Sequence, residues 1–205
     1  IMALMAIVMT LLFSQTAKAA DVMYTIYNSS EKTLTFYYGD KSTVVKGTNE
    51  TMYDVPTTNT FPGWWPSVCS QIKTVVFHSS FNDARPESCY YWFSDCFNLT
   101  KITDIQNLHT DDVTNMKNMC SNCSKLTSLD LSNFNTAAVE TMESMFESCT
   151  GLTTLTLSSN FNTANVTSMG SMFFQCLALE KLDLSNFITD KVEKMNLMFG
   201  GCSKL

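Results

Sequence analysis

The side chains of this 205-residue chain that could carry out chemistry include eight cysteines and two histidines. Thiolates and imidazoles are common nucleophiles, general bases and zinc ligands. Cys120-x-x-Cys123, with His109 nearby, has the spacing of half a zinc site, but no second pair follows it. Neither His78 nor His109 lies in a recognisable nucleophile motif. The sequence therefore predicts no metal site, no cofactor and no enzyme activity.

Five of the cysteines recur at steps of 27, 26, 27 and 26 residues: Cys96, Cys123, Cys149, Cys176 and Cys202. A period of this length is typical of repeats that stack and share one core. We expect buried free thiols, because equivalent side chains would point inward side by side and not toward each other. Cys69 and Cys89 lie outside the series, and a disulfide between them is an alternative in an oxidising compartment.

Each repeat changes its hydrophobic period once. Leu129 and Leu131 alternate with polar residues, which is typical of a strand. The apolar residues that follow are spaced like one face of a helix: Val139, Met142, Met145, Phe146 and Cys149. A threonine stands before each such segment and is expected to cap it: Thr110, Thr136, Thr163 and Thr189. The pattern predicts an α/β fold, a right-handed leucine-rich-repeat-like solenoid with strands on one side and short helices on the other.

We divide the chain into three parts. Residues 1–20 form an apolar run that ends in Ala-Lys-Ala-Ala, which indicates a signal peptide and export. Residues 21–88 do not repeat and form a β-rich N-terminal cap, and residues 89–205 form the solenoid. The sequence ends within a repeat, at Ser203-Lys204-Leu205, so we expect the solenoid to be truncated there.

Within the cap, four runs of strand-forming residues stand out: Met23–Tyr27, Thr33–Tyr38, Thr43–Val45 and Ile72–Phe77. Gly39-Asp40 suggests a hairpin turn between the second and third runs. Phe61, Trp64 and Trp65 lie in a loop and either cover the first repeat or face a ligand. We favour the covering role, because the ends of repeat proteins need caps.

The composition limits the partners. A net charge of −6, without any cluster of Lys and Arg, argues against nucleic acid. The apolar run near the N-terminus is too short for a stable membrane span, so the mature chain is expected to have none. The 13 methionines mostly occupy repeating positions and are expected to fill the core. We expect a monomer that is secreted or held at the cell surface.

The repeat resembles that of the BspA-like leucine-rich surface proteins. The similarity rests on Leu126-Thr-Ser-Leu-Asp-Leu-Ser-Asn-Phe-Asn-Thr136, followed by the Met-Phe-x-x-Cys149 pattern, and it covers about residues 89–205. The lead-in segments Leu34–Tyr38 and Phe81–Pro86 are also similar to the N-terminal part of such proteins. The resemblance implies a secreted or surface-attached protein that adheres to host matrix proteins or to other cells.

The outward side chains of the strands are the candidate binding residues: Ser128, Asp130, Ser132, Thr154, Thr156, Ser158, Lys181, Asp183 and Ser185. A regular polar row on a rigid sheet suits an extended partner, here an extracellular protein or a cell-surface ligand. Two other interpretations stay open. One is a spacer that only projects another module from the surface, and the other, more remote, is a glycan-active enzyme.

Overall fold

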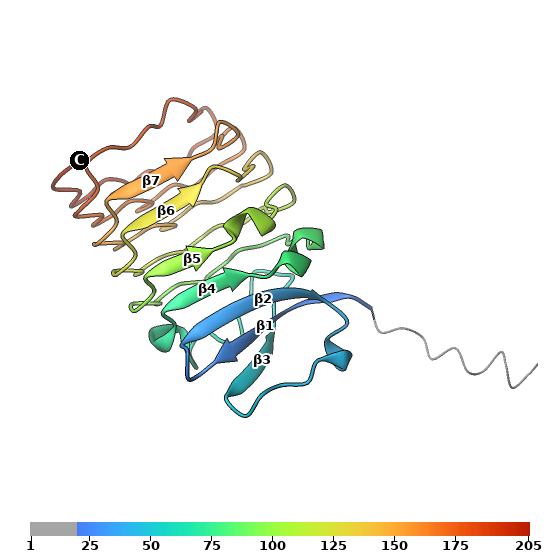
Figure 1. The fold of residues 1–205 in the computed structure, drawn as a ribbon. Helices are drawn as coiled ribbons and strands as arrows, with labels where there is room; N and C mark the ends of the chain where they lie inside the picture. The colour runs from blue at the N-terminus through green and yellow to red at the C-terminus, as the bar shows by residue number, and fades with distance from the viewer. Residues whose placement is uncertain (1–19) are drawn as a thin grey trace, which may run out of the picture.

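The computed structural model describes residues 20–205. The expected signal peptide lies outside the described residues except for Ala20, so it stays a prediction. Figure 1 shows strands lying side by side along one face, from β3 near one end of the molecule to β7 near the other. No helix within residues 20–205 is both long enough and apolar enough to cross a membrane.

A five-stranded sheet occupies the N-terminal end, in the order β3-β1-β2-β4-β5. Its strands are β1 (Val22–Asn28), β2 (Thr33–Gly39), β3 (Glu50–Asp54), β4 (Thr74–Phe77) and β5 (Lys101–Thr103). β1 pairs antiparallel with β2 and β3, whereas β4 pairs parallel with β2 and β5. Leu34 and Phe36 of β2 are fully buried and alternate with partly exposed residues, because only one face of this sheet packs on the core.

The strand predicted at Thr43–Val45 is not formed. The chain instead makes a 3-10 turn, η1 (Lys41–Thr43), in which the Asp40 carboxylate accepts a hydrogen bond from Ser42 N at 3.0 Å. Beyond this turn Glu50–Asp54 pairs with β1 and not with β2, so Gly39-Asp40 does not form the predicted hairpin. β3 was not predicted, because none of its residues is buried and its apolar pattern is weak.

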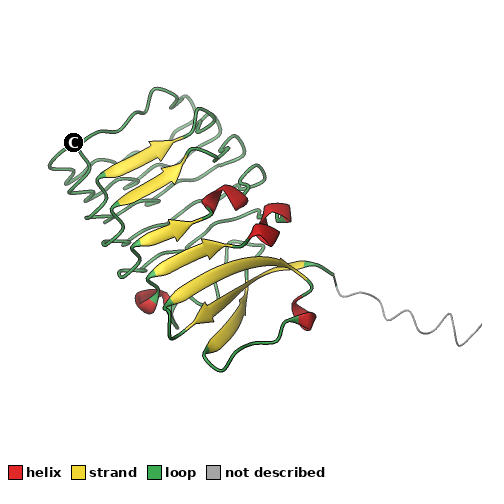
Figure 2. Ribbon diagram, viewed as in Figure 1, coloured by secondary structure: helices red, strands yellow, loops and turns green. Residues whose placement is uncertain are grey.

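The repeats lie in layers, one on the next (Figures 1 and 2). On the strand side, β6 (Ser128–Leu131) pairs parallel with β7 (Thr154–Leu157). On the opposite side, single parallel bridges join equivalent residues of successive repeats: Ser88 to Asn115, Asn115 to Thr141, Thr141 to Ser168, and Ser168 to Lys194. Backbone hydrogen bonds therefore connect neighbouring repeats along both sides of the layer.

The predicted fold class, an α/β leucine-rich-repeat-like solenoid with a helix in each repeat, is wrong. The described residues contain two β-sheets and no α-helix. Their only helical segments are short 3-10 turns: η1, η2 (Cys69–Gln71), η3 (Ser79–Asp83) and η4 (Ile105–Asn107). The segment from Val139 to Cys149 consists of turns and irregular structure with one bridge residue, Thr141, and its equivalents are built in the same way (Figure 2). The chain is mostly β and irregular.

Left-handed backbone conformations explain the missing helices. Ser144 and Ser148 have φ angles of 55° and 56°, and an α-helix of L-residues excludes such values. The other repeats have left-handed residues at the same two positions: Tyr91 and Asp95, Asn118 and Asn122, Ser171 and Gln175, Leu197 and Gly201. Alternate N–H groups consequently point to the next layer, and Ser144 N donates to Gly170 O at 2.9 Å. The same apolar residues are buried without a helix.

The threonines expected as helix caps have a different role. Thr110, Thr136 and Thr163 are buried, and each hydroxyl donates to a backbone carbonyl of the next layer. The distance from Thr136 Oγ1 to Asn162 O is 2.7 Å. Thr189, the fourth of the set, is exposed. These hydroxyls therefore join layers where helix capping was predicted.

One continuous hydrophobic core extends from the N-terminal sheet into the repeats. Trp64 is fully buried, and its indole Nε1 donates to Trp92 O at 2.8 Å, so it covers the first repeat. Phe61, in contrast, is 52% exposed and stacks on the partly exposed Trp65. The covering role predicted for this loop therefore belongs to Trp64.

Candidate functional site

The outward residues of β6 and β7 lie side by side. The parallel register places Ser128 beside Thr154 and Asp130 beside Thr156, and all four side chains are exposed. Leu129 and Leu131, which alternate with them, are buried. Anchoring of every second side chain in the core fixes the positions of the exposed ones.

Two of the predicted residues also close turns. Asp130 Oδ1 accepts a hydrogen bond from Ser132 N, and Asp183 Oδ1 accepts one from Ser185 N, both at 2.9 Å. The bond from Ser185 N favours the charged form of Asp183 and lowers the pKa of that carboxyl. The carboxylates therefore shape the loops that follow them, while both side chains stay exposed.

Ser158 does not share this surface. It is 6% exposed, and its hydroxyl donates to Phe134 O in the interior. Residues 181–185 form no strand, although Lys181, Asp183 and Ser185 are exposed in the layer beyond β7. We call the eight exposed members the strand row: Ser128, Asp130, Ser132, Thr154, Thr156, Lys181, Asp183 and Ser185.

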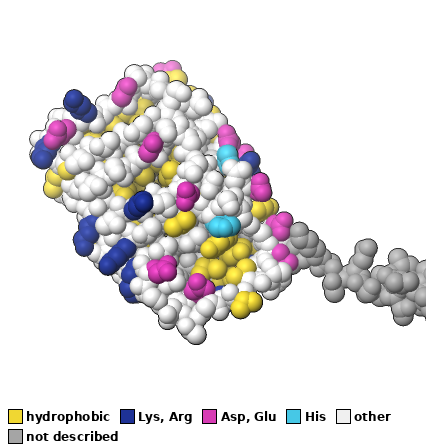
Figure 3. Space-filling model, in the orientation of Figure 1, with side chains coloured by type: hydrophobic (Ala, Val, Ile, Leu, Met, Phe, Trp, Pro, Cys, Tyr) yellow, Lys and Arg dark blue, Asp and Glu magenta, His cyan; other side chains and the backbone are white. Residues whose placement is uncertain are grey.

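A hollow of about 200 Å³ interrupts this face between β5 and β6. The five-stranded sheet ends at β5 and the second sheet begins at β6, so these two strands are not paired. Lys101 and Asp130 line the hollow and bring opposite charges to it. Figure 3 shows acidic side chains spread over this face and most of the basic side chains along its left-hand edge. Sequence reasoning missed Lys101, because the repeat that contains it departs from the common pattern. Lys101 lies one repeat before Ser128 in the sequence, and this spacing could have identified it.

The opposite side of the layers carries a charged pair. Lys117 Nζ lies 2.9 Å from Glu143 Oε1, and the two residues come from successive layers. The hydrogen bond from Lys117 lowers the pKa of Glu143, and the same bond raises the pKa of Lys117. Both side chains are about one-third exposed, so the pair is a surface contact of small energy.

The repeating thiols lie inside the layers. All eight cysteines are free, and all except the half-buried Cys202 are buried. Four thiols donate to carbonyl oxygens of the preceding layer: Cys123 to Phe93 at 3.2 Å, Cys149 to Cys120 at 3.1 Å, Cys176 to Phe146 at 3.1 Å, and Cys202 to Phe173 at 2.9 Å. Burial raises the pKa of Cys120 and of Cys176 to about 12. Protonated thiols of this kind are poor nucleophiles.

Both histidines take part in local hydrogen bonds. His78 Nδ1 accepts from Ser80 N at 3.1 Å at the start of η3, and His109 Nε2 lies 2.9 Å from Asn82 Oδ1. Across residues 20–205, no three His, Cys, Asp or Glu side chains are grouped so that they could hold a metal ion. These contacts give the two imidazoles structural roles.

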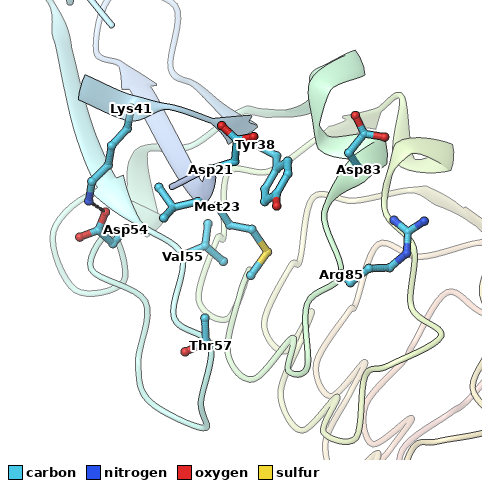
Figure 4. Close-up of a pocket in the computed structure, with 10 residues that line it drawn as sticks. Asp21, Met23, Tyr38, Lys41, Asp54, Val55, Thr57, Asp83 and Arg85 are labelled. Atoms are coloured by element: carbon cyan, nitrogen blue, oxygen red, sulfur yellow. Dashed lines mark hydrogen bonds and ion pairs between the residues drawn. The ribbon is translucent and has the colours of Figure 1, made fainter. Parts of the chain in front are cut away.

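A second and larger hollow, of about 530 Å³, lies at the N-terminal end beside β1, β2 and β3 (Figure 4). Met23, Tyr38, Lys41, Asp83 and Arg85 are among its lining residues. Sequence reasoning placed Met23 and Tyr38 in strands but assigned none of these five residues to a binding site. They come from separate segments, and no motif connects them, so only the fold brings them together.

The model of one protein family matches residues 87–205, and its description is Mycoplasma protein of unknown function, DUF285. No curated protein and no solved structure matches the chain. The family match corrects the expected membership of the BspA-like leucine-rich proteins. The Leu, Phe, Met and Cys positions that carried that assignment are buried in the layers. The need to fill a core accounts for them in unrelated repeat families as well.

Proposed function

Because the chain belongs to the family described as Mycoplasma protein of unknown function, a description that names no activity, we propose a function from the geometry. The chain is a non-enzymatic binding module. Its strand row contacts an extended extracellular protein or cell-surface ligand. It acts as a monomer after export through residues 1–20, either secreted or at the cell surface.

The exposed register of β6 and β7 is the observation that supports this proposal most. Ser128, Asp130, Thr154 and Thr156 offer hydroxyl and carboxylate groups at fixed spacing, with every intervening leucine turned inward. Parallel strands in successive layers lie about 4.8 Å apart, so equivalent polar groups recur at that interval. An extended partner can contact several layers at once, and such multiple weak contacts add up in affinity.

The hollow between β5 and β6 adds specificity to the row. Lys101 and Asp130 present a donor and an acceptor of opposite charge on its two sides. A partner with matching polar groups gains charge-assisted hydrogen bonds there, which are stronger than neutral ones. The strand row and this hollow together form the proposed contact surface.

Arginine substitutions on β7 test the proposal. Thr154→Arg combined with Thr156→Arg adds two bulky cations at exposed positions and leaves the partly buried Leu155 and Leu157 of β7 in place. The purified chain, the double variant and the control Asn196→Arg, at an exposed position on the opposite side, are assayed on immobilised matrix proteins and on cells. We expect the wild type and the control to bind equally and the double variant to bind at least about tenfold more weakly.

Equal binding by the double variant would place the contact elsewhere on the molecule. Absence of binding by the wild-type chain to every matrix protein and cell type would favour the spacer interpretation. Thermal unfolding of all three proteins is the control for folding.

A further inference from the structure

The hollow at the N-terminal end has a mostly apolar floor. Met23 of β1 and Val55, which follows β3, lie at its base, and Tyr38 of β2 stands beside them (Figure 4). Val55 is buried, and Met23 and Tyr38 are partly buried against the core. A floor of this kind takes up the C–H surface of a ligand. The volume of about 530 Å³ is in the range of small-molecule sites.

Charged residues stand on two sides of this floor. On one side Lys41 and Asp54 form an ion pair, and on the other lie Asp83 and Arg85 (Figure 4). Each side thus offers one cation that donates hydrogen bonds and one carboxylate that accepts them. Asp21 also lines the hollow, so three acidic and two basic side chains surround it, with a formal sum of −1.

Arg85 is held in place by the backbone. Its Nη1 donates to Asn82 O at 2.9 Å and to Ala84 O at 2.7 Å. A guanidinium has five N–H donors, and those on Nη2 and Nε have no hydrogen-bond partner among the described residues. Fixing one edge of the group leaves donors available for a ligand, with less conformational entropy to lose on binding.

We propose that this hollow binds a neutral sugar residue. Each hydroxyl of a sugar both donates and accepts, so neighbouring hydroxyls can bridge an acid and a base of the kind found on each side. The C–H face of the ring would lie on Met23 and Tyr38. The alternating signs disfavour other ligands, because an anion meets three carboxylates and a cation meets Lys41 and Arg85.

This site is independent of the proposed function of the strand row. Its lining residues come from β1, β2, β3 and the segment around η3, whereas the strand row lies on β6, β7 and the layer beyond them. An experiment can therefore show loss of sugar binding at the hollow while partner binding at the strand row persists, or the reverse. The Thr154→Arg, Thr156→Arg variant is expected to retain sugar binding.

The methyl group of Met23 is a direct reporter, because its side chain extends into the hollow (Figure 4). The chain is labelled with [¹³C]methyl-methionine, and its methyl spectrum is recorded during titration with the neutral disaccharides lactose and diacetylchitobiose. Sialyllactose and trilysine serve as the anionic and cationic probes, and Met23→Leu assigns the signal. We expect the Met23 signal to shift with a neutral disaccharide at about millimolar concentration.

Asp83→Asn tests the contact at an exposed carboxylate, and Asp83→Asn with Arg85→Met removes both charges of one side. We expect each variant to bind the neutral disaccharide with an affinity that is lower by about tenfold or more. The matched control Asp190→Asn with Lys204→Met removes one acid and one base at exposed positions outside the hollow and should have no effect. Three results would overturn the proposal: no shift with either neutral sugar, equal affinity in the Asp83→Asn variant, or a Met23 shift with trilysine or sialyllactose alone.

Discussion

At the scale of single residues, four of the five repeating cysteines fill the core and also donate a hydrogen bond. The thiol of Cys149 reaches Cys120 O at 3.1 Å, across to the preceding layer. Alanine would fill less volume and donate nothing, whereas serine would bury a more strongly polar hydroxyl. A small, weakly polar donor suits this position, which explains the recurrence of cysteine without a disulfide or a metal.

Alkylation should separate the cysteines by burial. At about pH 8 a thiol with a pKa of about 12, such as Cys176, is a thiolate in only about one molecule in ten thousand. We expect iodoacetamide to modify the half-buried Cys202 first and the fully buried Cys123 and Cys149 only after denaturant is added. Peptide mass spectrometry over time measures the order. Equal rates for Cys149 and Cys202 in the folded protein would show that the layers open freely.

Because of the Lys117–Glu143 pair, we expect the free energy of unfolding to depend weakly on pH. The pKa of Glu143 lies below its ordinary value of 4.5. The stabilisation that its charged form provides is therefore present above pH 4.5 and is lost as the pH falls through the lowered pKa. The pKa of Lys117 lies above 10.5, so its contribution is lost only as the pH rises through the raised value. Between these limits Lys117→Met should cost less than about 1 kcal/mol of unfolding free energy.

NMR titration of the Glu143 carboxylate checks this account. In Lys117→Met the pKa of Glu143 should rise toward its ordinary value, because the first cause of the shift is the hydrogen bond from Lys117. An unchanged pKa would mean that Ser168 and Lys194, which also lower it, dominate.

At the scale of elements, β6 and β7 were predictable, whereas the strand expected at residues 181–185 does not form and the connecting segments were not predicted. Leu129 and Leu131 alternate with polar residues, and β6 forms where this alternation predicts a strand. The apolar spacing from Val139 to Cys149 equally predicts a helix, because periodicity reports which side chains are buried and not the backbone path between them. The signal against a helix was local and weak: Asp95, Asn118, Asn122 and Gly201 occupy four of the ten left-handed positions, and Gly, Asn and Asp tolerate φ values above zero better than most residues.

Two neighbouring glycine substitutions separate the observed backbone from a helix. Ser148 has a φ of 56°, whereas the preceding Glu147 is not left-handed. A left-handed L-residue costs roughly 1–2 kcal/mol, so Ser148→Gly should leave the unfolding free energy unchanged or raise it slightly. Glu147→Gly should lower it by about 0.5–1 kcal/mol. Chemical denaturation measures both, and a similar loss at the two positions would support a helix.

At the scale of the whole molecule, the layers turn their most regular residues inward and leave the strand row exposed. The alternation of polar and apolar residues in the sequence correctly predicted the members of the strand row that lie on β6 and β7. The same alternation wrongly predicted that Ser158 is exposed, because its hydroxyl donates to Phe134 O in the interior. The hollows could not be predicted. One arises where β5 and β6 fail to pair, and the other where separate segments meet beside the N-terminal sheet.

Photo-crosslinking at the strand row tests the central claim most directly. A benzophenone side chain in place of Thr156 stands on the proposed contact surface, and one in place of Asn196 is exposed on the opposite side. Each labelled chain is irradiated with the matrix protein or cells that bind it most strongly, and the products are identified by mass spectrometry. We expect the partner to crosslink to position 156 and not to position 196. Crosslinking at position 196 alone, or no crosslink at position 156 while binding persists, would contradict the proposed role of the strand row.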